Sequence, residues 1–451
     1  MAENVLKGSA HDIKEILRRI KNRDFSGNSG LAIKNSIYQF STNFAIKIGS
    51  LIFTVIIARL LMPELFGLYN LALSTILIFF MVSNMGIGQA LVRFVSREIG
   101  KKNFVKARSY VFYIWKVKAL LIAFSAIVLL VLAKFISETY YQKPIFWALV
   151  AGSVYILFYG LATFLEYVLQ ASNYFNRIFH KEMLFQIFRV VIVPIAVILA
   201  VKGSLSDEAV LSVLFLALAF SYLLISLFMV FFQIKTIWFM SSRKKDLSGR
   251  EKKVTNRFLI ALSATALSGL FFEYVDKVML GHFVQSEFIG YYSVAISIVG
   301  AFIAIEGFGT ALLPIFSRAK KKALERGLKK SLMIVFIFSF LTALVLFILA
   351  PYLVSIIYGS VYLQSITALR LLSLLLIPLP LIAIYSSYFI SVGRPKLLAK
   401  YLIISTLLNI LLNYILITSL LKYGGIAAIL GAGAATIISE FFYLVALVIE
   451  K

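Results

Sequence analysis

Apolar residues along this chain gather in twelve runs of 18 to 27 residues, separated by shorter polar connections. About 20 consecutive apolar residues are needed to cross the hydrocarbon core of a bilayer as a helix. The pattern predicts an all-α integral membrane protein with about 12 transmembrane helices. Their expected limits are 35–58, 67–91, 110–133, 144–169, 184–201, 209–234, 258–280, 289–315, 331–357, 364–390, 398–420 and 425–449.

One stretch of this pattern occurs twice, from Ala58 to Arg97 and again from Leu280 to Ala319. Five residues return 223 positions later: Glu64, Gly67, Tyr69, Ala72 and Ser74 become Glu287, Gly290, Tyr292, Ala295 and Ser297. Gly86-x-Gly88 likewise returns as Gly307-x-Gly309, where close packing or a flexible helix end is expected rather than a phosphate loop. A repeat of this length indicates that each half of the chain is one structural unit.

The longest polar connection, 235–257, separates the first six predicted helices from the last six. Six is an even number, so both halves enter the membrane in the same sense. The expected organisation is a basic tail over 1–33, a six-helix lobe over 34–234, a basic linker over 235–257 and a second lobe over 258–451. Transporters built from parallel halves commonly bind their substrate between the halves.

Composition excludes a water-soluble protein. The chain is 61% hydrophobic and 14% charged, with a mean hydropathy of +0.94, whereas soluble domains have about 45–50% apolar and about 25% charged residues. There are no cysteines, so disulfides and thiolate metal sites are excluded. Since the three histidines lie far apart, no metal centre is predicted.

The net charge of +25 would favour nucleic-acid binding in a soluble protein. Here the positions of the charges give a different interpretation. Of the 45 Lys and Arg residues, 34 lie in the terminal segments and the even-to-odd connections, and six lie in connections on the other side. By the positive-inside rule both termini are cytoplasmic. The tail could equally be a solvated segment or a helix lying on an anionic leaflet.

The first predicted helix carries a polar stripe. Its members fall at intervals of three and four residues and therefore share one helical face: Ser36, Gln39, Asn43, Lys47, Ser50 and Thr54. A stripe with a lysine near its middle does not face lipid. It lines a water-filled cavity or packs against another polar helix, and Lys47 favours the cavity.

Other cations lie within predicted spans. Lys116 and Lys118 are about 200° apart on a helix and cannot share a face, so one is expected to face the cavity and the other to reach the headgroups. The sequence leaves open which of the two lysines faces the cavity. Arg189 lies near a helix end and is expected to snorkel, whereas Arg370 lies deeper and is a cavity candidate. Such cations provide charge-assisted hydrogen bonds to a diphosphate.

Acidic residues within the membrane are fewer. Asp276, Glu166 and Glu306 are candidates for binding a coupling ion or for pairing with Lys or Arg at the lobe interface, and both alternatives stay open. Pro378 and Pro380 are expected to kink the tenth helix.

The motifs as a whole resemble a known family. The run ARLLMPELFGLYNLA, the Gly86-x-Gly88-x-Ala-Leu-Val-Arg-Phe segment and the segment Tyr274 to Gly281 are similar to those of the oligosaccharide-repeat-unit (Wzx-like) flippases. These belong to the polysaccharide-transport branch of the multidrug/oligosaccharidyl-lipid/polysaccharide (MOP) exporter superfamily. The resemblance covers the chain from about residue 31 onward. Asp276 matches the family's Asp at the end of the seventh helix.

The resemblance implies a V-shaped pair of lobes around a central cavity. It also implies a monomer that moves a polyprenyl-diphosphate-linked oligosaccharide from the cytoplasmic to the outer leaflet of the cell membrane, without a cofactor, together with other polysaccharide-assembly proteins. Whether Na⁺ or H⁺ drives transport is open. The absence of helices beyond the twelfth weighs against the lipid II flippase branch. The alternatives are a small-molecule antiporter of the same superfamily and, last, a membrane glycosyltransferase, for which the short outer connections lack an Asp-x-Asp pair.

Overall fold

The computed structural model describes residues 27–235, 237–241, 245–305 and 321–451, and in these residues every regular element is a helix. Ten of the helical segments among them are long and apolar enough to cross a membrane. The prediction of an all-α membrane protein is therefore confirmed. The basic tail, Glu306, Gly307 and Gly309 lie outside the described residues.

The first two predicted helices form one continuous element, α2 (Gly27–Asn84), which is broken at Met62. Met62 has φ 61° and ψ 170°, which is not a helical conformation, and Pro63 follows it. Because proline removes a helical hydrogen bond and clashes with the preceding turn, the chain changes direction here. The turn expected after residue 58 is thus a kink rather than a loop.

The second span ends earlier than predicted. Gly86 adopts a left-handed conformation (φ 62°), which glycine accepts at little cost, and α3 (Ile87–Gly100) starts after it. Gly88 allows close packing, because a methyl group added there would lie 2.5 Å from the Tyr167 ring. Close packing at this motif, and not a phosphate loop, is what the sequence predicted.

The rest of the N-terminal half has one helix for each predicted span. It consists of α4 (Phe104–Lys134), α5 (Phe146–Ala171), α6 (Phe175–Lys202) and α7 (Asp207–Phe228). Helices α4 and α6 start earlier than predicted. Helices α4 and α7 continue into π-helical turns, Phe135–Tyr141 and Met229–Ile234.

The C-terminal half begins with α8 (Gly249–Phe283), followed by α9 (Ser286–Ile305) and α12 (Lys321–Ile357). The tenth predicted helix is divided into α13 (Ser365–Leu372), a 3₁₀ turn (Ser373–Leu376) and α14 (Pro378–Ser391). The predicted kink at Pro378 is therefore present. Helices α15 (Pro395–Leu421) and α16 (Gly425–Ile449) complete the chain.

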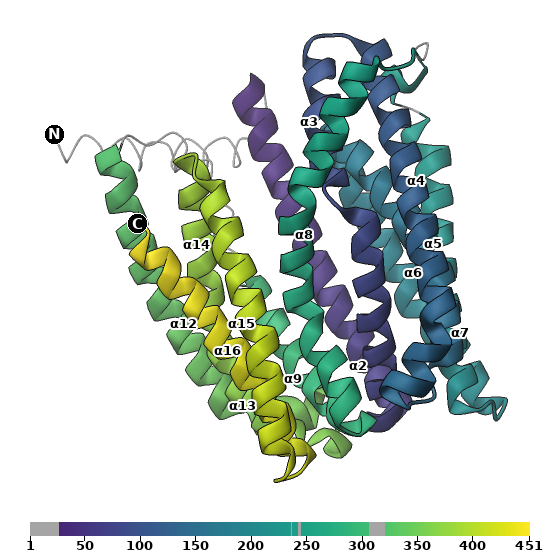
Figure 1. The fold of residues 1–451 in the computed structure, drawn as a ribbon, viewed down its shortest axis with the longest axis vertical. Helices are drawn as coiled ribbons and strands as arrows, with labels where there is room; N and C mark the ends of the chain where they lie inside the picture. The colour runs from purple at the N-terminus through teal and green to yellow at the C-terminus, as the bar shows by residue number, and fades with distance from the viewer. Residues whose placement is uncertain (1–26, 236, 242–244, 306–320) are drawn as a thin grey trace.

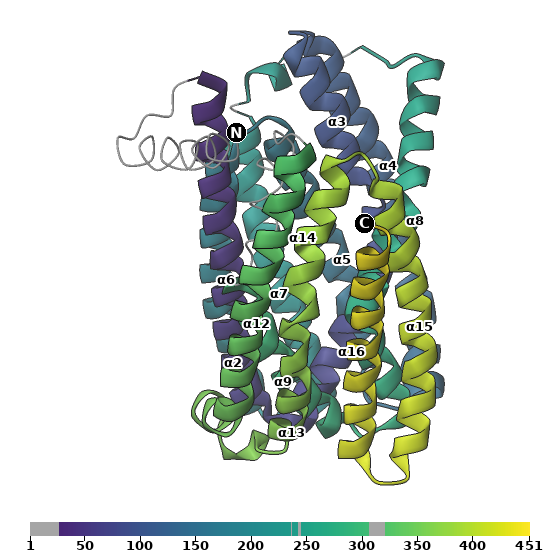
Figure 2. The same cartoon turned by 90° about the vertical axis from the view of Figure 1, so that its left-hand side faces the viewer.

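The helices form two groups (Figure 1). In Figure 1, α12, α14, α15 and α16 lean away from α3 to α7 toward the upper end, where the α3–α4 and α14–α15 turns lie. We call the end with the α3–α4 and α14–α15 turns the basic end, and the opposite end the far end. Figure 2 shows α2 beside α6 at one margin and α8 beside α15 at the other. The largest apolar core contains residues of both halves.

At the far end the two halves are joined by polar contacts to main-chain oxygens. Arg59 donates to the carbonyls of Ile356 and Ile357 at 2.6 and 2.9 Å, at the end of α12. Tyr362 donates to the Ala58 carbonyl at 2.7 Å, and Lys143 to the Gly281 carbonyl at 2.7 Å. The buried Tyr362 hydroxyl needs such a partner, and together these contacts stabilise the joint.

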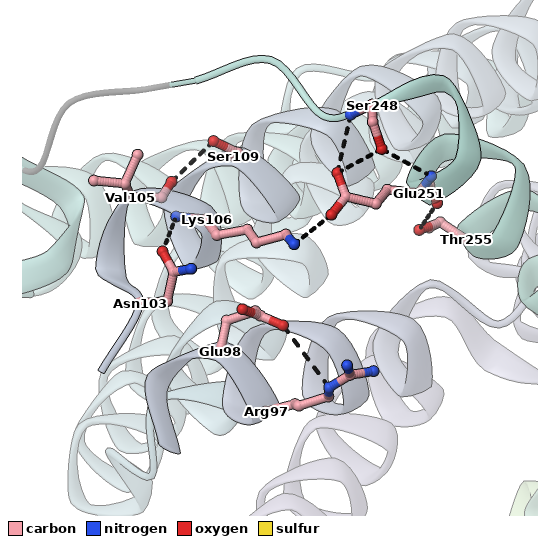
Figure 3. A network of polar contacts seen from close by, with 9 residues as sticks. All are labelled: Arg97, Glu98, Asn103, Val105, Lys106, Ser109, Ser248, Glu251 and Thr255. Atoms are coloured by element: carbon pink, nitrogen blue, oxygen red, sulfur yellow. Dashed lines mark hydrogen bonds and ion pairs between the residues drawn. The ribbon is translucent and has the colours of Figure 1, made fainter. Parts of the chain in front are cut away.

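At the basic end the start of α8 contacts the N-terminal half (Figure 3). Ser248 and Glu251 form a capping box at the N-terminus of α8, and Lys106 of α4 forms an ion pair with Glu251. Further along α8, Asn256 accepts a hydrogen bond from Tyr113, and Phe258 lies under the Arg93 guanidinium at 4.5 Å. Helix α8 therefore contacts the first half at the basic end, while it also packs against α15 of the second half.

Candidate functional site

The first half of α2 places its predicted polar stripe on an open face. Gln39, Asn43 and Lys47 are exposed, and Ser50 and Thr54 are half-buried. The side chain of Ser36 lies outside the described residues. A second face is apolar and exposed, with Phe40, Phe44, Ile48 and Ile52 among others. The remaining face packs against α6.

The polar stripe is connected to α6 through Arg189. The Arg189 guanidinium donates from Nη2 to Ser50 Oγ at 3.1 Å and to Gln186 Oε1 at 2.7 Å. It also lies over the Phe53 ring at 4.6 Å. Arg189 therefore points inward to α2, and the expectation that it snorkels toward the headgroups is wrong. The aromatic ring and the hydroxyl offer the guanidinium better partners than a helix end does.

A chain of hydrogen bonds continues from Gln186 into α5. Gln186 donates to Glu182 Oε1 at 2.6 Å, and Lys181 donates to Glu182 at 2.9 Å and to Glu166 at 2.7 Å. Lys181 and Glu182 are each 7% exposed, whereas Glu166 is 34% exposed. Of the two roles left open for Glu166, the geometry provides the pairing with a lysine, within the N-terminal half.

Asp276 of α8 lies in a second polar cluster, between α9, α15 and α16. Its carboxylate accepts hydrogen bonds from Tyr292 at 2.5 Å, Thr436 at 2.6 Å and Asn413 at 2.8 Å. Asn409, one turn before Asn413, donates to Thr436 Oγ1 at 3.2 Å. The carboxylate is buried, and its contacts are hydroxyl and amide groups.

This cluster has unused acceptor atoms. The Oδ1 atoms of Asn409 and Asn413 are buried and have no hydrogen-bond partner. Buried polar atoms without partners are uncommon and call for an explanation. One carboxylate with amide and hydroxyl oxygens is a donor set for a hard cation, which takes oxygen ligands. The described residues hold no group of three or more His, Cys, Asp or Glu side chains that could bind a metal ion, and the oxygen donors that contact Asp276 are neutral.

The other predicted cations lie elsewhere. Lys118 is fully buried, donates to Asn84 Oδ1 at 3.1 Å and lies 5.0 Å from the Phe80 ring, whereas Lys116 is exposed. Arg370 is exposed and lies over Phe347 of α12 at 5.4 Å. The structure thus places Lys118 inside the N-terminal half, and Arg189 contacts Ser50, which lies one turn from Lys47 on α2. The substrate roles of Lys116, Lys118 and Arg370 remain predictions.

Sequence reasoning missed several members of both clusters. Ser405, Asn409 and Asn413 recur every four residues along α15, a spacing that marks one polar helical face in an apolar span. That signal could have found the partners of Asp276. Lys181 and Glu182 were taken as part of a basic connection, and their burial follows from the length of α6, which starts at Phe175 rather than at 184.

Comparison with protein families gives a match over more than half of the chain. The family model for polysaccharide biosynthesis proteins matches residues 32–320. The chain belongs to this family. A second model, named MatE, matches residues 261–415. This family member is accordingly a multi-pass membrane transporter of the MOP superfamily and not an enzyme, as the resemblance implied.

Solved structures of the superfamily share the fold of this polysaccharide biosynthesis family member. An inward-facing multidrug resistance MATE transporter aligns with a TM-score of 0.66 at 13% identity, covering 92% of this chain and 94% of its own. The lipid II flippase MurJ in an inward closed conformation aligns with a TM-score of 0.66 at 16% identity, covering 92% and 87%. A MOP superfamily transporter from Pyrococcus furiosus aligns at 0.56 and 13%, covering 94% of each chain. Among curated proteins no significant match was found.

Proposed function

We propose that this protein is a flippase that moves a polyprenyl-diphosphate-linked oligosaccharide from the cytoplasmic to the outer leaflet by alternating access. The observation that carries the proposal is the exposed polar face of α2, with Lys47 near its middle. A charged side chain within a membrane span is costly and by default indicates a substrate or ion pathway. In a family of polysaccharide biosynthesis proteins, a cation on such a face suits an anionic, sugar-bearing head group.

The two exposed faces of α2 suit the two parts of this substrate. The stripe of Gln39, Asn43 and Lys47 offers hydrogen bonds for hydroxyl and phosphate oxygens. The neighbouring apolar face, with Phe40 and Phe44, suits a polyprenyl chain that stays in lipid. A single helix therefore carries one face for the head group and another for the tail.

The Asp276 cluster is proposed as the coupling site. It lies in the C-terminal half, whereas the α2 stripe lies in the N-terminal half, so ion and substrate would occupy different places. A cation bound by Asp276 and the free Oδ1 atoms of Asn409 and Asn413 would hold α8 and α15 together. Since α8 also contacts α3 and α4 at the basic end, a change in its packing would be passed to the first half.

The distribution of charge gives the proposed orientation of the protein in the membrane, whereas the proposed direction of transport comes from the resemblance to the flippases. With the basic end in the cytoplasm, the contacts of Arg59, Lys143 and Tyr362 join the halves on the outer side. The arrangement then corresponds to a transporter that is closed outward. Movement of substrate requires that these contacts break while new ones form at the basic end.

A second candidate function is an ion-coupled small-molecule antiporter of the multidrug type. The match of the MatE model to residues 261–415 favours it. Such a carrier for organic cations is expected to present carboxylates and aromatic rings to its substrate. The described face of α2 presents a lysine instead, which favours the anionic substrate.

The proposal is tested with purified protein in vesicles that contain a lipid-diphosphate-linked sugar. Lys47→Ala and Arg370→Ala, made separately, are each expected to abolish transport while protein level and membrane insertion persist. Lys202→Gln, an exposed cation at the far end of α6, is the control. Normal transport by both alanine variants would overturn the basic-site proposal.

A further inference from the structure

Arg189 stands out because its hydrogen-bond partners are neutral. Its guanidinium donates to the hydroxyl of Ser50 and the amide oxygen of Gln186. None of the ion pairs among the described residues involves Arg189. Its Nε atom is buried and has no hydrogen-bond partner. The guanidinium is half-buried and makes no ion pair with a carboxylate among the described residues, although arginine is well suited to bind carboxylate or phosphate oxygens in pairs.

Two aromatic rings hold the guanidinium in place. The Arg189 Cζ atom lies 4.6 Å from the Phe53 ring of α2 and 5.6 Å from the Phe185 ring of its own helix. Aromatic faces attract a guanidinium and fix its plane without using its N–H donors. The rings thus fix the charge without occupying its N–H donors, of which those of Nη2 bond to Ser50 and Gln186.

The hydrogen-bonded network runs from Glu166 of α5 through side chains of α6 to Arg189. Lys181 is bonded to both Glu166 and Glu182, and Gln186 links Glu182 to Arg189. Two carboxylates and two cations balance overall, which lowers the cost of burying them. The negative end of this network is Glu166 in α5. The positive end is the Arg189 guanidinium of α6, which lies against α2. The positive end is therefore directed to the polar stripe.

Ser50 connects this positive end to Lys47. The two residues are three positions apart on α2 and so lie on the same face, one turn from each other. Ser50 accepts the hydrogen bond from Arg189, and Lys47 is exposed. The polar face of α2 therefore carries the exposed Lys47 one turn from Ser50, the residue that the half-buried Arg189 of α6 contacts.

We propose that Arg189 is the phosphate-contacting residue of the substrate site, which it forms together with Lys47 of α2. The inference rests on the proposed function. It names the side chain that binds the diphosphate of the proposed substrate. In the proposed complex a phosphate oxygen replaces Ser50 Oγ as the hydrogen-bond acceptor. A second phosphate oxygen accepts from another N–H group of the planar guanidinium, a geometry that lysine cannot provide. Gln186 is a positioning residue, because it accepts a hydrogen bond from Arg189, and Glu182 in turn accepts one from Gln186 and holds it in place.

Gly49 is part of this arrangement. A methyl group added at Gly49 would lie 2.4 Å from Gln186 Oε1, the atom that accepts the bond from Arg189. The missing side chain gives Gln186 room to approach α2. Gly49→Ala therefore displaces Gln186 without changing any charge, and it tests the positioning separately from the cation itself.

The test is calorimetric binding of farnesyl diphosphate to the purified full-length protein, with farnesol as the probe that lacks the diphosphate. Arg189→Gln is expected to weaken farnesyl diphosphate binding by about tenfold or more, because it removes charge-assisted hydrogen bonds. Arg189→Lys is expected to fall between the wild type and Arg189→Gln, and Gly49→Ala to weaken binding a few-fold. Lys202→Gln has the same change in charge on the same helix and is expected to bind as the wild type does.

Thermal unfolding of each variant shows whether it is folded. Unchanged binding of farnesyl diphosphate by folded Arg189→Gln would overturn the inference and leave the proposed function standing. An equal loss in Lys202→Gln would overturn it too, since the effect would then be one of net charge. A wild type that binds farnesyl diphosphate no better than farnesol would contradict the proposed function itself.

Discussion

Gly67 and Gly290 occupy equivalent positions in the two copies of the repeat, and they pack against each other's segment. A methyl group added at Gly67 would lie 1.7 Å from the Ser286 carbonyl oxygen, and one added at Gly290 would lie 2.3 Å from the Pro63 carbonyl oxygen. The backbones of α2 and α9 therefore touch at the joint between the halves. Small residues at such crossings are typical of helices packed within membranes.

This contact predicts that neither glycine tolerates a side chain. Gly67→Ala and Gly290→Ala are each expected to destabilise the protein by about 1–3 kcal/mol or more, because backbone atoms and not flexible side chains are in the way. Thermal unfolding in detergent measures the effect. Gly300→Ala, also on α9, meets nothing within 4 Å and is expected to be neutral or slightly stabilising. A similar loss for all three variants would contradict the prediction.

Arg59 is expected to hold the far end closed. Its two hydrogen bonds satisfy the last carbonyls of α12, and Arg59→Ala removes both. We expect the distribution of distances between the halves at this end to broaden toward longer values. Since the chain has no cysteines, spin labels attached to Glu138→Cys and Tyr423→Cys, both exposed near this end, report the distance. An unchanged distribution in Arg59→Ala would show that the apolar packing alone keeps the end closed.

Asp276→Asn is expected to abolish any stabilisation of the protein by Na⁺. The substitution keeps the shape of the side chain and removes the charge that a cation needs. The wild type is expected to unfold at a higher temperature in NaCl than in choline chloride, as linkage requires for an ion that binds the folded state. Asp207→Asn, an exposed carboxylate at the start of α7, is the matched control. A sodium effect that persists in Asp276→Asn would exclude this cluster as the site.

The ion pair at the basic end predicts a dependence on pH. The hydrogen bond from Lys106 lowers the pKa of Glu251, which lies outside the membrane part of α8. A carboxyl group with a lowered pKa in the folded state stabilises above its unfolded pKa of about 4.3, and this contribution is lost as the pH falls through the folded pKa.

Glu251→Gln is therefore expected to cost up to about 1 kcal/mol near neutral pH, from the ion pair alone, because glutamine keeps the capping box. The difference in unfolding temperature between the variant and the wild type should shrink as the pH falls below about 4. A difference that stays constant down to pH 3 would mean that the charge of Glu251 contributes nothing.

The sequence predicted the all-α membrane class and the order of the membrane helices, because hydropathy and helix length are local properties; of about twelve predicted spans, ten candidates are found among the described residues. It also identified the polar face of α2 and the kink at Pro378. It did not predict the inward direction of Arg189, since that depends on Phe53 and Ser50, more than 130 positions earlier in the chain. The partners of Asp276 come from three other helices, and only their packing brings them together.

Two of the expectations that stay predictions depend on contacts between distant segments. One is the division at residues 234 and 258: the start of α8 contacts α3 and α4, so this helix has contacts in both halves. The other is the joint action of Lys47 with Arg370, whose exposed side chain lies over Phe347. In both cases hydropathy places the residues along or between the membrane spans, but which residues they contact depends on tertiary packing.

Transport of a labelled head group across a vesicle membrane tests the central proposal most directly. Vesicles containing the purified protein and a polyprenyl-diphosphate-linked sugar are treated with a lectin that reaches only outward-facing sugars. The wild type is expected to expose sugars that protein-free vesicles keep protected, and not to export a cationic dye. Export of the dye without movement of the lipid-linked sugar would contradict the proposed function and support the antiporter.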